Sequence, residues 1–252
     1  MYDLQRADLW KRISAWLFDI ILLVIAAVGA ALLLSAVLGY DSYSGQLEDV
    51  KLRCEKEYGV ELDVSEAEYD AKTEEERALY DEAYSAFSHD EEAVHAYGMM
   101  VNLTFLIVVF AILFGTLLLE FLVPLLLGNG QTVGKKIFGI GVMREDGVKL
   151  TPMLLFIRTV LGKYTVETMI PVMILLMFWF GTMGILGLIL ILAILVVQVV
   201  MVFATRARTP IHDKLAHTVT VDLASQKIFD TPEDLLAYKQ RIHAARAQNA
   251  DY

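Results

Sequence analysis

The chain has 252 residues, 56% of them hydrophobic, and a net charge of −10. Its apolar residues come in runs longer than the core of a soluble domain needs, so the composition indicates an integral membrane protein and excludes a soluble globular one. The one cysteine, Cys54, excludes an intramolecular disulfide.

The first long apolar run covers residues 13–38 and holds a single charge, Asp19. Its 26 residues exceed the roughly 20 that span hydrocarbon. Basic residues precede the run, as in a secretory signal peptide, but the run is longer than a signal core and has an acid near its start. We therefore expect residues 1–40 to form the N-terminus and an uncleaved first transmembrane helix.

Residues 41–98 form a strongly acidic segment, with 18 Asp and Glu against 5 Lys and Arg. Two capping boxes, Ser65 with Glu68 and Thr73 with Glu76, predict helix starts. Apolar residues at intervals of three and four then predict a helix from about Glu74 towards the second span. A solvated acidic helix is the simpler interpretation, and attraction of cations to a pore mouth is the alternative.

The second apolar run covers residues 99–127 and holds one charge, Glu120, just before Pro124. A third apolar region, residues 165–204, is interrupted at 181–184. Because Arg158, Lys163 and Glu167 leave only a short uncharged stretch before that interruption, the third segment is expected to be an interfacial helix leading into a short or tilted span. A re-entrant hairpin turning at residues 181–184 is the alternative.

The segment at residues 128–164 contains the most recognisable sequence motifs of the chain. A phosphate-binding loop would need glycine where Asn129 stands and Ser or Thr where Lys136 stands, so that site is excluded. Residues 137–143 and 148–151 flank Asp146–Gly147, a strong turn signal, and are predicted to pair as a β-hairpin. Residues 219–221 are a candidate third strand.

Lys and Arg gather in three segments, namely before the first span, at 128–164, and after the last apolar run. The positive-inside rule places these three segments in the cytoplasm and the acidic segment 41–98 outside. Four membrane segments satisfy this arrangement, with both termini inside, and Thr231 caps a helix in the tail 205–252. The basic residues nearest the apolar runs are Arg6, Lys11, Arg12, Lys135, Lys136, Arg144, Lys149, Arg158, Lys163, Arg206, Arg208 and Lys214.

Three motifs occur in order along the chain: RISAWLFD at residues 12–19, GQTVGKK at residues 130–136 and HDKLAHTVTV at residues 212–221. Together they resemble the RDD family of bacterial membrane proteins, over about residues 5–40 and 99–222. The arginine and two aspartates of the family name correspond to Arg12, Asp19 and Asp213. Many relatives carry glycine where this chain has His217, and the acidic loop is longer than expected. The remaining motif residues are Gly130, Gln131, Thr132, Gly134, Lys135, Lys136, Gly139, Asp146, Gly147, Arg158 and Thr218.

The resemblance implies an RDD-like domain over residues 5–222 with the acidic loop inserted, in a bacterial inner membrane. The fold class is therefore an all-α integral membrane protein with a small cytoplasmic β-hairpin. Transport of cations, with sodium–proton exchange proposed for some members, or of small solutes is the implied function. A non-transporting membrane scaffold or assembly factor is the alternative.

The sequence also carries expectations about partners and chemistry. The chain is expected to assemble as a homo-oligomer, since four helices enclose little pathway, and to bind monovalent cations and protons but no nucleic acid. Neither a cofactor nor a metal is expected. No enzyme motif is present, since the five histidines lack metal-site spacing and Asp19 has no aspartate at membrane depth on another span to form a protease dyad.

A carboxylate inside an apolar helix needs compensation. We expect Arg158 or Lys163 to neutralise Asp19, and Arg12 to face Asp213, because Arg12 and Asp19 are two helical turns apart. Ala15 lies between them and permits close approach of a neighbour. Together, Arg12, Asp19, Glu120, Arg158 and Asp213 form the candidate network, which either fixes the packing of the spans or carries ions.

Overall fold

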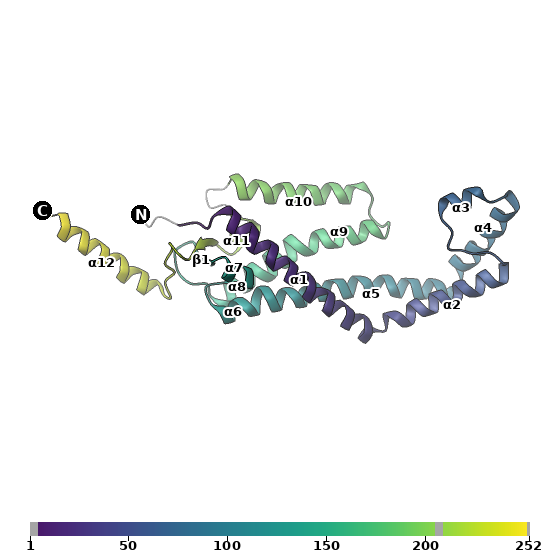
Figure 1. Ribbon diagram of the computed structural model, residues 1–252, viewed down its shortest axis with the longest axis horizontal. Helices are drawn as coiled ribbons and strands as arrows, with labels where there is room; N and C mark the ends of the chain where they lie inside the picture. Colours follow the sequence, from purple (N-terminus) through teal and green to yellow (C-terminus); the bar gives the residue numbers. More distant parts are fainter. Residues whose placement is uncertain (1–4, 205–208, 251–252) are drawn as a thin grey trace. The chain divides into compact units, whose positions relative to one another are not determined.

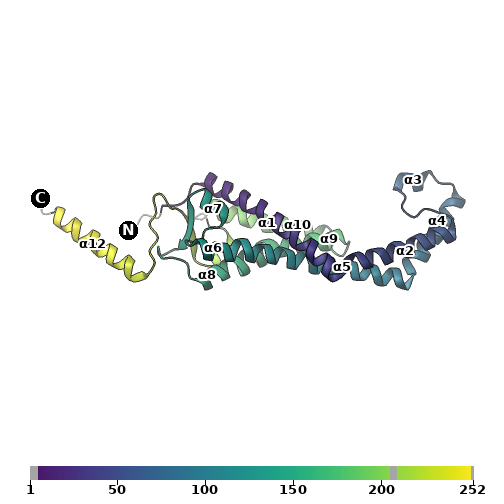
Figure 2. The ribbon, with the colours of Figure 1, turned by 60° about the horizontal axis from the view of Figure 1, so that its bottom comes forward.

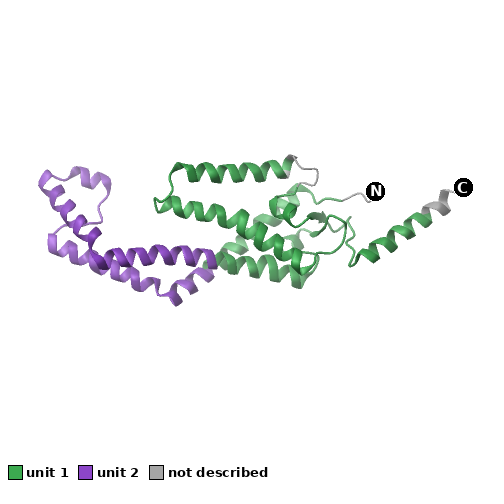
Figure 3. Ribbon diagram, turned by 180° about the vertical axis from the view of Figure 1, so that it is seen from behind, with its two compact units in different colours: residues 1–28, 111–252 green, residues 29–110 purple. Residues whose placement is uncertain are grey.

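The structure, a computed structural model, describes residues 5–204 and 209–250. It is mostly helical and divides into two compact units, residues 29–110 and residues 1–28 with 111–252 (Figure 3). Arg206 and Arg208, which contribute to the predicted orientation, lie outside the described residues. The helices outside the sheet region are α1 (Leu9–Leu38), α2 (Tyr40–Tyr58), α3 (Glu66–Ala71), α4 (Glu74–His89), α5 (Glu91–Thr116), α6 (Val123–Leu127), α8 (Pro152–Phe156), α9 (Ile170–Trp179), α10 (Ile185–Ala204) and α12 (Pro232–Ala250).

Three helices of the described residues are long and apolar enough to cross a membrane: Leu9–Leu38, Glu91–Leu127 and Pro152–Trp179. The second is α5, the π-helical turn η1 (Leu117–Leu122) and α6 in one continuous rod. The third is α8, the π-helical stretch η2 (Ile157–Met169) and α9. The two predicted spans at 13–38 and 99–127 are thus confirmed as long apolar helices.

The third long helix differs from the predicted short span. It runs without a break for 28 residues, through Arg158, Lys163 and Glu167, because these charged side chains are largely buried against other parts of unit 1. A turn containing Gly181, at φ 68°, then joins α9 to the apolar helix α10, and the two helices pack together (Figure 1). The predicted turn at 181–184 is therefore present.

The predicted β-hairpin forms only next to its turn, where Met143 and Lys149 make one antiparallel bridge and the Arg144 N–H donates to the Val148 carbonyl at 2.9 Å. Strand β1 (Ile140–Arg144) pairs antiparallel with β2 (Thr218–Asp222), far along the chain, so the candidate third strand is the actual partner. The turn at Gly147 forms, but Val148 and Lys149 make only single bridges. The predicted hairpin is shortened at both ends, because Ile137 belongs to helix α7 (Val133–Ile137) and Thr151 caps α8.

Buried side chains of this two-stranded sheet form part of the core of unit 1. Val142, Met143, Val219 and Val221 are each at most 1% exposed. A short helix, α11 (Ile211–Leu215), leads into β2. The predicted capping residue Thr231 accepts a hydrogen bond from the Asp234 N–H at 3.1 Å, and α12 begins there as predicted.

The unit of residues 29–110 has its own small core. Both predicted capping boxes form, on α3 and α4, and α4 packs against α2 (Figure 2). The helix predicted from Glu74 ends at His89, because Asp90 caps α5 by accepting from the Glu92 and Ala93 N–H groups. Cys54 is buried in this core.

Candidate functional site

Arg158 and Asp213 form an ion pair inside unit 1. Arg158 Nε donates to Asp213 Oδ1 over 2.7 Å, and the two side chains are 3% and 1% exposed. Thr218 donates a second hydrogen bond to the same oxygen at 2.9 Å. Because Arg158 lies in η2 and Asp213 in α11, the pair fastens the segment before β2 to the third long helix.

The electrostatics of Asp213 involve a second arginine. Burial raises the pKa of this carboxyl, but the positive charge of Arg158, with a smaller contribution from Arg12, outweighs burial and holds the pKa well below its usual range. Arg12 therefore lies within electrostatic reach of Asp213, where the sequence analysis expected it. Two of the three residues of the family name thus act on one another.

A histidine and a glutamate extend this pair. Glu167 of η2 accepts the backbone N–H of His212 at 2.8 Å, and its other oxygen lies 2.7 Å from His212 Nδ1. Arg158 Nη2 lies 3.0 Å from His212 Nε2. Since an arginine can only donate, Nε2 is the acceptor and Nδ1 carries the proton that goes to Glu167.

A glycine makes this contact between α11 and η2 possible. A Cβ added to Gly162 would lie 2.7 Å from the Cα of His212, so only glycine permits the approach. Sequence reasoning missed the role of His212 and Glu167, because it tested histidines for metal spacing and treated Glu167 as a charge to be tolerated. Gly162, about one helical turn before Glu167, was the sequence feature that could have indicated a close contact here.

Glu120 and Lys163 form the second ion pair, between the second and third long helices. Lys163 Nζ donates to Glu120 Oε1, and the Glu120 side chain is 3% exposed. Thr159 donates to the Glu120 carbonyl at 3.0 Å. The other carboxylate oxygen, Oε2, is buried and is the one such side-chain atom without a hydrogen-bond partner in the part of the chain that the structure describes.

Both partners of that pair lie in π-helical turns. Glu120 is in η1 and Lys163 in η2. A π-helical turn widens the helix and is found frequently at functional sites. This feature, which has no simple sequence signature, sets Glu120 apart from an ordinary buried ion pair.

The expected cation partner of Asp19 is wrong, since Arg158 pairs with Asp213 and Lys163 with Glu120. Asp19 is 8% exposed and accepts two uncharged donors instead. The hydroxyl of Thr132 donates to Oδ2, and the backbone N–H of Gly134 donates to Oδ1 at 2.8 Å.

The contact at Asp19 docks the short helix α7 on α1. Thr132 caps α7 by accepting from the Lys135 N–H, so one side chain caps the helix and holds Asp19. A Cβ on Gly134 would lie 2.4 Å from the Ala15 carbonyl oxygen, and Ala15 is 1% exposed. The close approach expected at Ala15 is thus made by the glycine of the second family motif.

Lys135 is placed by this docked helix near several charges. Its pKa is lowered to about 8, chiefly by burial; the charges of Arg158 and Lys163 act in the same direction, and those of Glu120 and Asp19 oppose the shift. Lys136, the next residue, is exposed. The two adjacent lysines therefore differ in environment although the sequence gives no way to rank them.

The other motif residues shape the loop around α7 and the β1 turn. Gly130 and Gly139 have φ of 58° and 67°, which glycine adopts without strain. Gln131 donates to the Ile140 carbonyl at 3.0 Å, and Asp146 accepts from the N–H of Val148 at 3.2 Å. These residues position the network and add no charge to it.

The described residues contain no group of three or more His, Cys, Asp or Glu side chains that could hold a metal ion. Neither the curated proteins nor the solved structures include a match to this chain. The model of the RDD family matches residues 6–217, which include the ion pairs and both docking contacts described above. With its long apolar helices and this match, the chain belongs to the RDD family of membrane proteins.

Proposed function

We propose that this chain is a membrane transporter that exchanges a monovalent cation for a proton, with Glu120 binding the cation. The observation that carries the proposal is the buried Oε2 atom of Glu120, which no described group satisfies by a hydrogen bond. Leaving a carboxylate oxygen unpaired is costly, and ionisable side chains inside apolar helices generally mark ion pathways.

Lys135 supplies the proton side of the exchange. Its pKa of about 8 is supported in part by the negative charge of Glu120. A cation bound at Glu120 would neutralise that charge and lower the pKa of Lys135 further. Cation binding at Glu120 and protonation of Lys135 therefore disfavour one another, and exchange requires such a coupling.

Asp19 has a positioning role in this proposal. Asp19 was predicted to belong to a network that either fixes the packing of the spans or carries ions, and both of its oxygens already accept hydrogen bonds. By holding Thr132 and Gly134, Asp19 fixes α7 and hence Lys135. Arg12, Arg158 and Asp213 hold the adjoining segment in the same way.

The proposed setting is a bacterial inner membrane, with both termini cytoplasmic and residues 41–98 outside. The basic residues beside the long helices support that orientation, and the apolar helix α10 supports a fourth membrane segment. A homo-oligomer is proposed because four helices enclose little pathway.

A membrane scaffold or assembly factor is the second candidate. The observation that favours it is the completeness of the Arg158–Asp213 pair, in which Asp213 accepts from Arg158 and Thr218 and leaves little opportunity for a ligand. A scaffold needs the network only to fold. It therefore predicts that changes at Glu120 lower the amount of assembled protein and alter no flux.

Proton flux in proteoliposomes tests the transport proposal. Purified protein is reconstituted, a pH gradient is imposed, and sodium, potassium or lithium is added outside. Wild-type protein is expected to show cation-dependent proton flux, Glu120→Gln to abolish it, and Glu145→Gln, at an exposed glutamate beside β1, to retain it.

A double variant separates loss of function from loss of fold. Glu120→Gln alone leaves Lys163 buried without its partner, whereas Glu120→Gln with Lys163→Gln removes both charges and is expected to fold better. Flux must be absent from the double variant too. Persistent flux in Glu120→Gln, or no flux from well-folded wild type with any of the three cations, would contradict the proposal, and the second result would favour the scaffold.

A further inference from the structure

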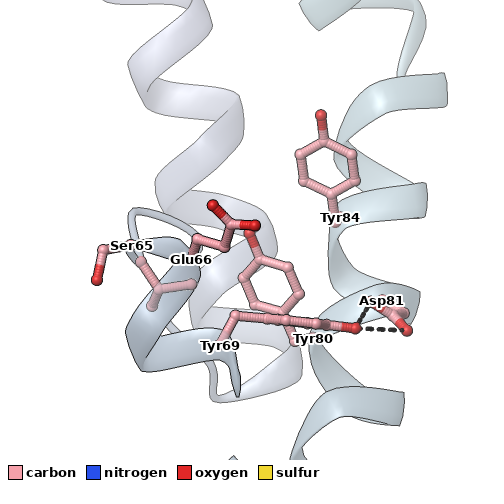
Figure 4. Close-up of a pocket in the computed structure, with 7 residues that line it drawn as sticks. Ser65, Glu66, Tyr69, Tyr80, Asp81 and Tyr84 are labelled. Carbon is pink, nitrogen blue, oxygen red and sulfur yellow. Dashed lines mark hydrogen bonds between the residues drawn. The ribbon is translucent and has the colours of Figure 1, made fainter. Parts of the chain in front are cut away.

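The unit of residues 29–110, called the acidic unit below, contains a hollow of about 350 Å³ between α3 and α4. Figure 4 shows three tyrosine rings at this hollow, from Tyr69 on α3 and Tyr80 and Tyr84 on α4, together with the carboxylates of Glu66 and Asp81. The volume falls within the range of small-ligand sites. The lining combines aromatic faces with negative charge.

The three rings form one connected aromatic wall. The rings of Tyr69 and Tyr80 meet edge to face with centroids 5.2 Å apart, and those of Tyr80 and Tyr84 lie nearly parallel at 6.2 Å. The Tyr69 hydroxyl donates to both oxygens of Asp81, at 3.0 and 3.2 Å, and the Tyr80 hydroxyl donates to the Leu62 carbonyl. These hydrogen bonds fix two of the rings in place.

Two carboxylates lie beside the aromatic wall, and neither has a basic side chain as a partner among the residues placed by the structure. Within the described residues, neither Glu66 nor Asp81 forms an ion pair with a basic side chain. The neighbouring cation, Arg77, donates instead to the backbone carbonyls of Tyr69 and Asp70. Its guanidinium also lies 5.5 Å from the centroid of the Tyr69 ring, so this ring already accepts one cation.

We infer that this hollow binds a small organic cation of the alkylammonium class, held against the tyrosine faces and neutralised by Glu66 and Asp81. An aromatic face attracts a cation through its quadrupole, and a carboxylate adds direct charge attraction. The hydrogen bond to Asp81 raises the pKa of Tyr69, and burial raises that of Tyr80, so both phenols stay uncharged at neutral pH. The inference is independent of the transport proposal.

An organic cation fits the hollow better than a bare metal ion. Two carboxylates are fewer oxygen ligands than calcium takes, and no cluster of three acidic or metal-binding side chains occurs among the residues placed by the structure. The volume is also far larger than one ion fills. Hard metal ions take oxygen ligands, whereas the tyrosine faces suit the apolar groups and diffuse charge of an organic cation.

The test is choline binding by the full-length protein in phosphatidylglycerol nanodiscs, which contain no lipid ammonium group. Binding is followed by saturation-transfer NMR of the choline methyl protons. The control ligand is the uncharged isostere in which a tert-butyl group replaces trimethylammonium. Saturable binding of choline, but not of the isostere, is expected; equal binding of both, or no saturable binding of choline, would overturn the inference.

Matched variants assign the binding to the hollow. Tyr84→Leu is expected to weaken choline binding about five-fold and Tyr84→Phe to retain it, since the ring face is what matters. Tyr97→Leu is the control, because Tyr97 lies outside the hollow and is 54% exposed, as is Tyr84. An equal effect of Tyr84→Leu and Tyr97→Leu would contradict the assignment.

A second pair of variants tests whether the charge of Glu66 contributes to choline binding. Glu66 and Glu74 each follow the capping residue of a helix, on α3 and α4, but only Glu66 lines the hollow. Glu66→Gln should weaken choline binding and Glu74→Gln should not; equal weakening would refute a local site. Repeating the choline titration in phosphatidylcholine nanodiscs identifies the natural source of the cation. If lipid headgroups occupy the hollow, they compete and added choline binds more weakly; if the hollow takes a free cation, choline binding is unchanged.

Discussion

Three buried carboxylates of unit 1 are compensated in three different ways. Asp213 accepts from a buried arginine and from Thr218, Asp19 accepts from a hydroxyl and a backbone N–H, and Glu120 has one oxygen on Lys163 and the other unpaired. Because an unpaired buried oxygen is the costly state, Glu120 is the carboxylate with the most to gain from a bound cation.

The Arg158–Asp213 pair provides the first prediction. Asp213→Leu should destabilise the protein by about 3 to 5 kcal/mol, because it leaves Arg158 buried without its partner, whereas Arg158→Met with Asp213→Leu should cost much less. Thermal unfolding in detergent measures both. If the double variant is as unstable as the single one, the pair does not act as a unit.

Sequence reasoning at this scale found the charged residues but not their partners. Helical spacing placed Arg12 and Asp19 on one face, and burial of a carboxylate required compensation. Which cation or hydrogen-bond donor faces Asp19 depends on how α7 and η2 pack, and no local pattern contains that information. The unpaired Oε2 of Glu120 is likewise a property of packing alone.

At the scale of elements, two glycines bring charged segments into contact. Gly134 lets α7 reach Ala15 and Asp19 on α1, and Gly162 lets α11 reach η2. At each glycine, backbone atoms of the neighbouring segment occupy the space that a side chain would need. Through these contacts the family motifs, which are far apart in the sequence, converge on one end of unit 1.

Gly134→Ala is predicted to destabilise the protein by about 1 to 3 kcal/mol, since the added Cβ would lie 2.4 Å from a backbone oxygen. Gly184→Ala is the control, because a Cβ there meets nothing within 4 Å. Thermal unfolding of both variants in the same detergent checks the prediction. Equal stability of the two variants would show that α7 is not docked on α1 as described.

His217 is predicted to carry backbone strain. Its φ of 49° lies in the left-handed region, which glycine adopts without strain, so His217→Gly should raise stability by up to about 1 kcal/mol. His217→Ala keeps a Cβ and should give no such gain. A gain from alanine that matches the gain from glycine would point to the imidazole rather than to the backbone.

The strand pairing shows where local signals stop. Asp146–Gly147 correctly predicted a turn, because its chemistry is local. The partner of β1 is 74 or more residues away along the chain at every position of the register, and β2 was noted only as a third strand. Capping boxes, which are local, were found correctly at Ser65 and Thr73.

At the scale of the molecule, the acidic segment of residues 41–98 lies between two long apolar runs in the sequence and contributes to a small separate core. Its only thiol, Cys54, is 6% exposed, and burial raises the pKa of that thiol. Labelling of native Cys54, the obvious test of orientation from the sequence, would therefore report burial as much as sidedness. Orientation needs engineered cysteines on exposed positions.

In a Cys54→Ala background, Glu75→Cys in the acidic unit should react with a membrane-impermeant maleimide in intact spheroplasts. Lys136→Cys, at an exposed position of the basic segment, should react only after the membrane is opened. Both variants should react in detergent, which controls for burial. The reverse pattern in spheroplasts would invert the proposed orientation.

The coupling of Glu120 to Lys135 is the central claim, and proton release on cation addition tests it most directly. Purified protein in weakly buffered detergent is mixed with sodium, potassium or lithium, and a pH indicator follows released protons. Release should be greatest near pH 8, where Lys135 titrates. It should fall at lower pH, where Lys135 keeps its proton, and at higher pH, where that proton is already lost.

Glu120→Gln and Lys135→Met should each abolish the release, the first by removing the cation site and the second by removing the proton. Lys136→Met, at the exposed neighbour, should release protons as the wild type does. Release that persists in Lys135→Met, or that is absent from folded wild-type protein at pH 8 with all three cations, would contradict the exchange mechanism.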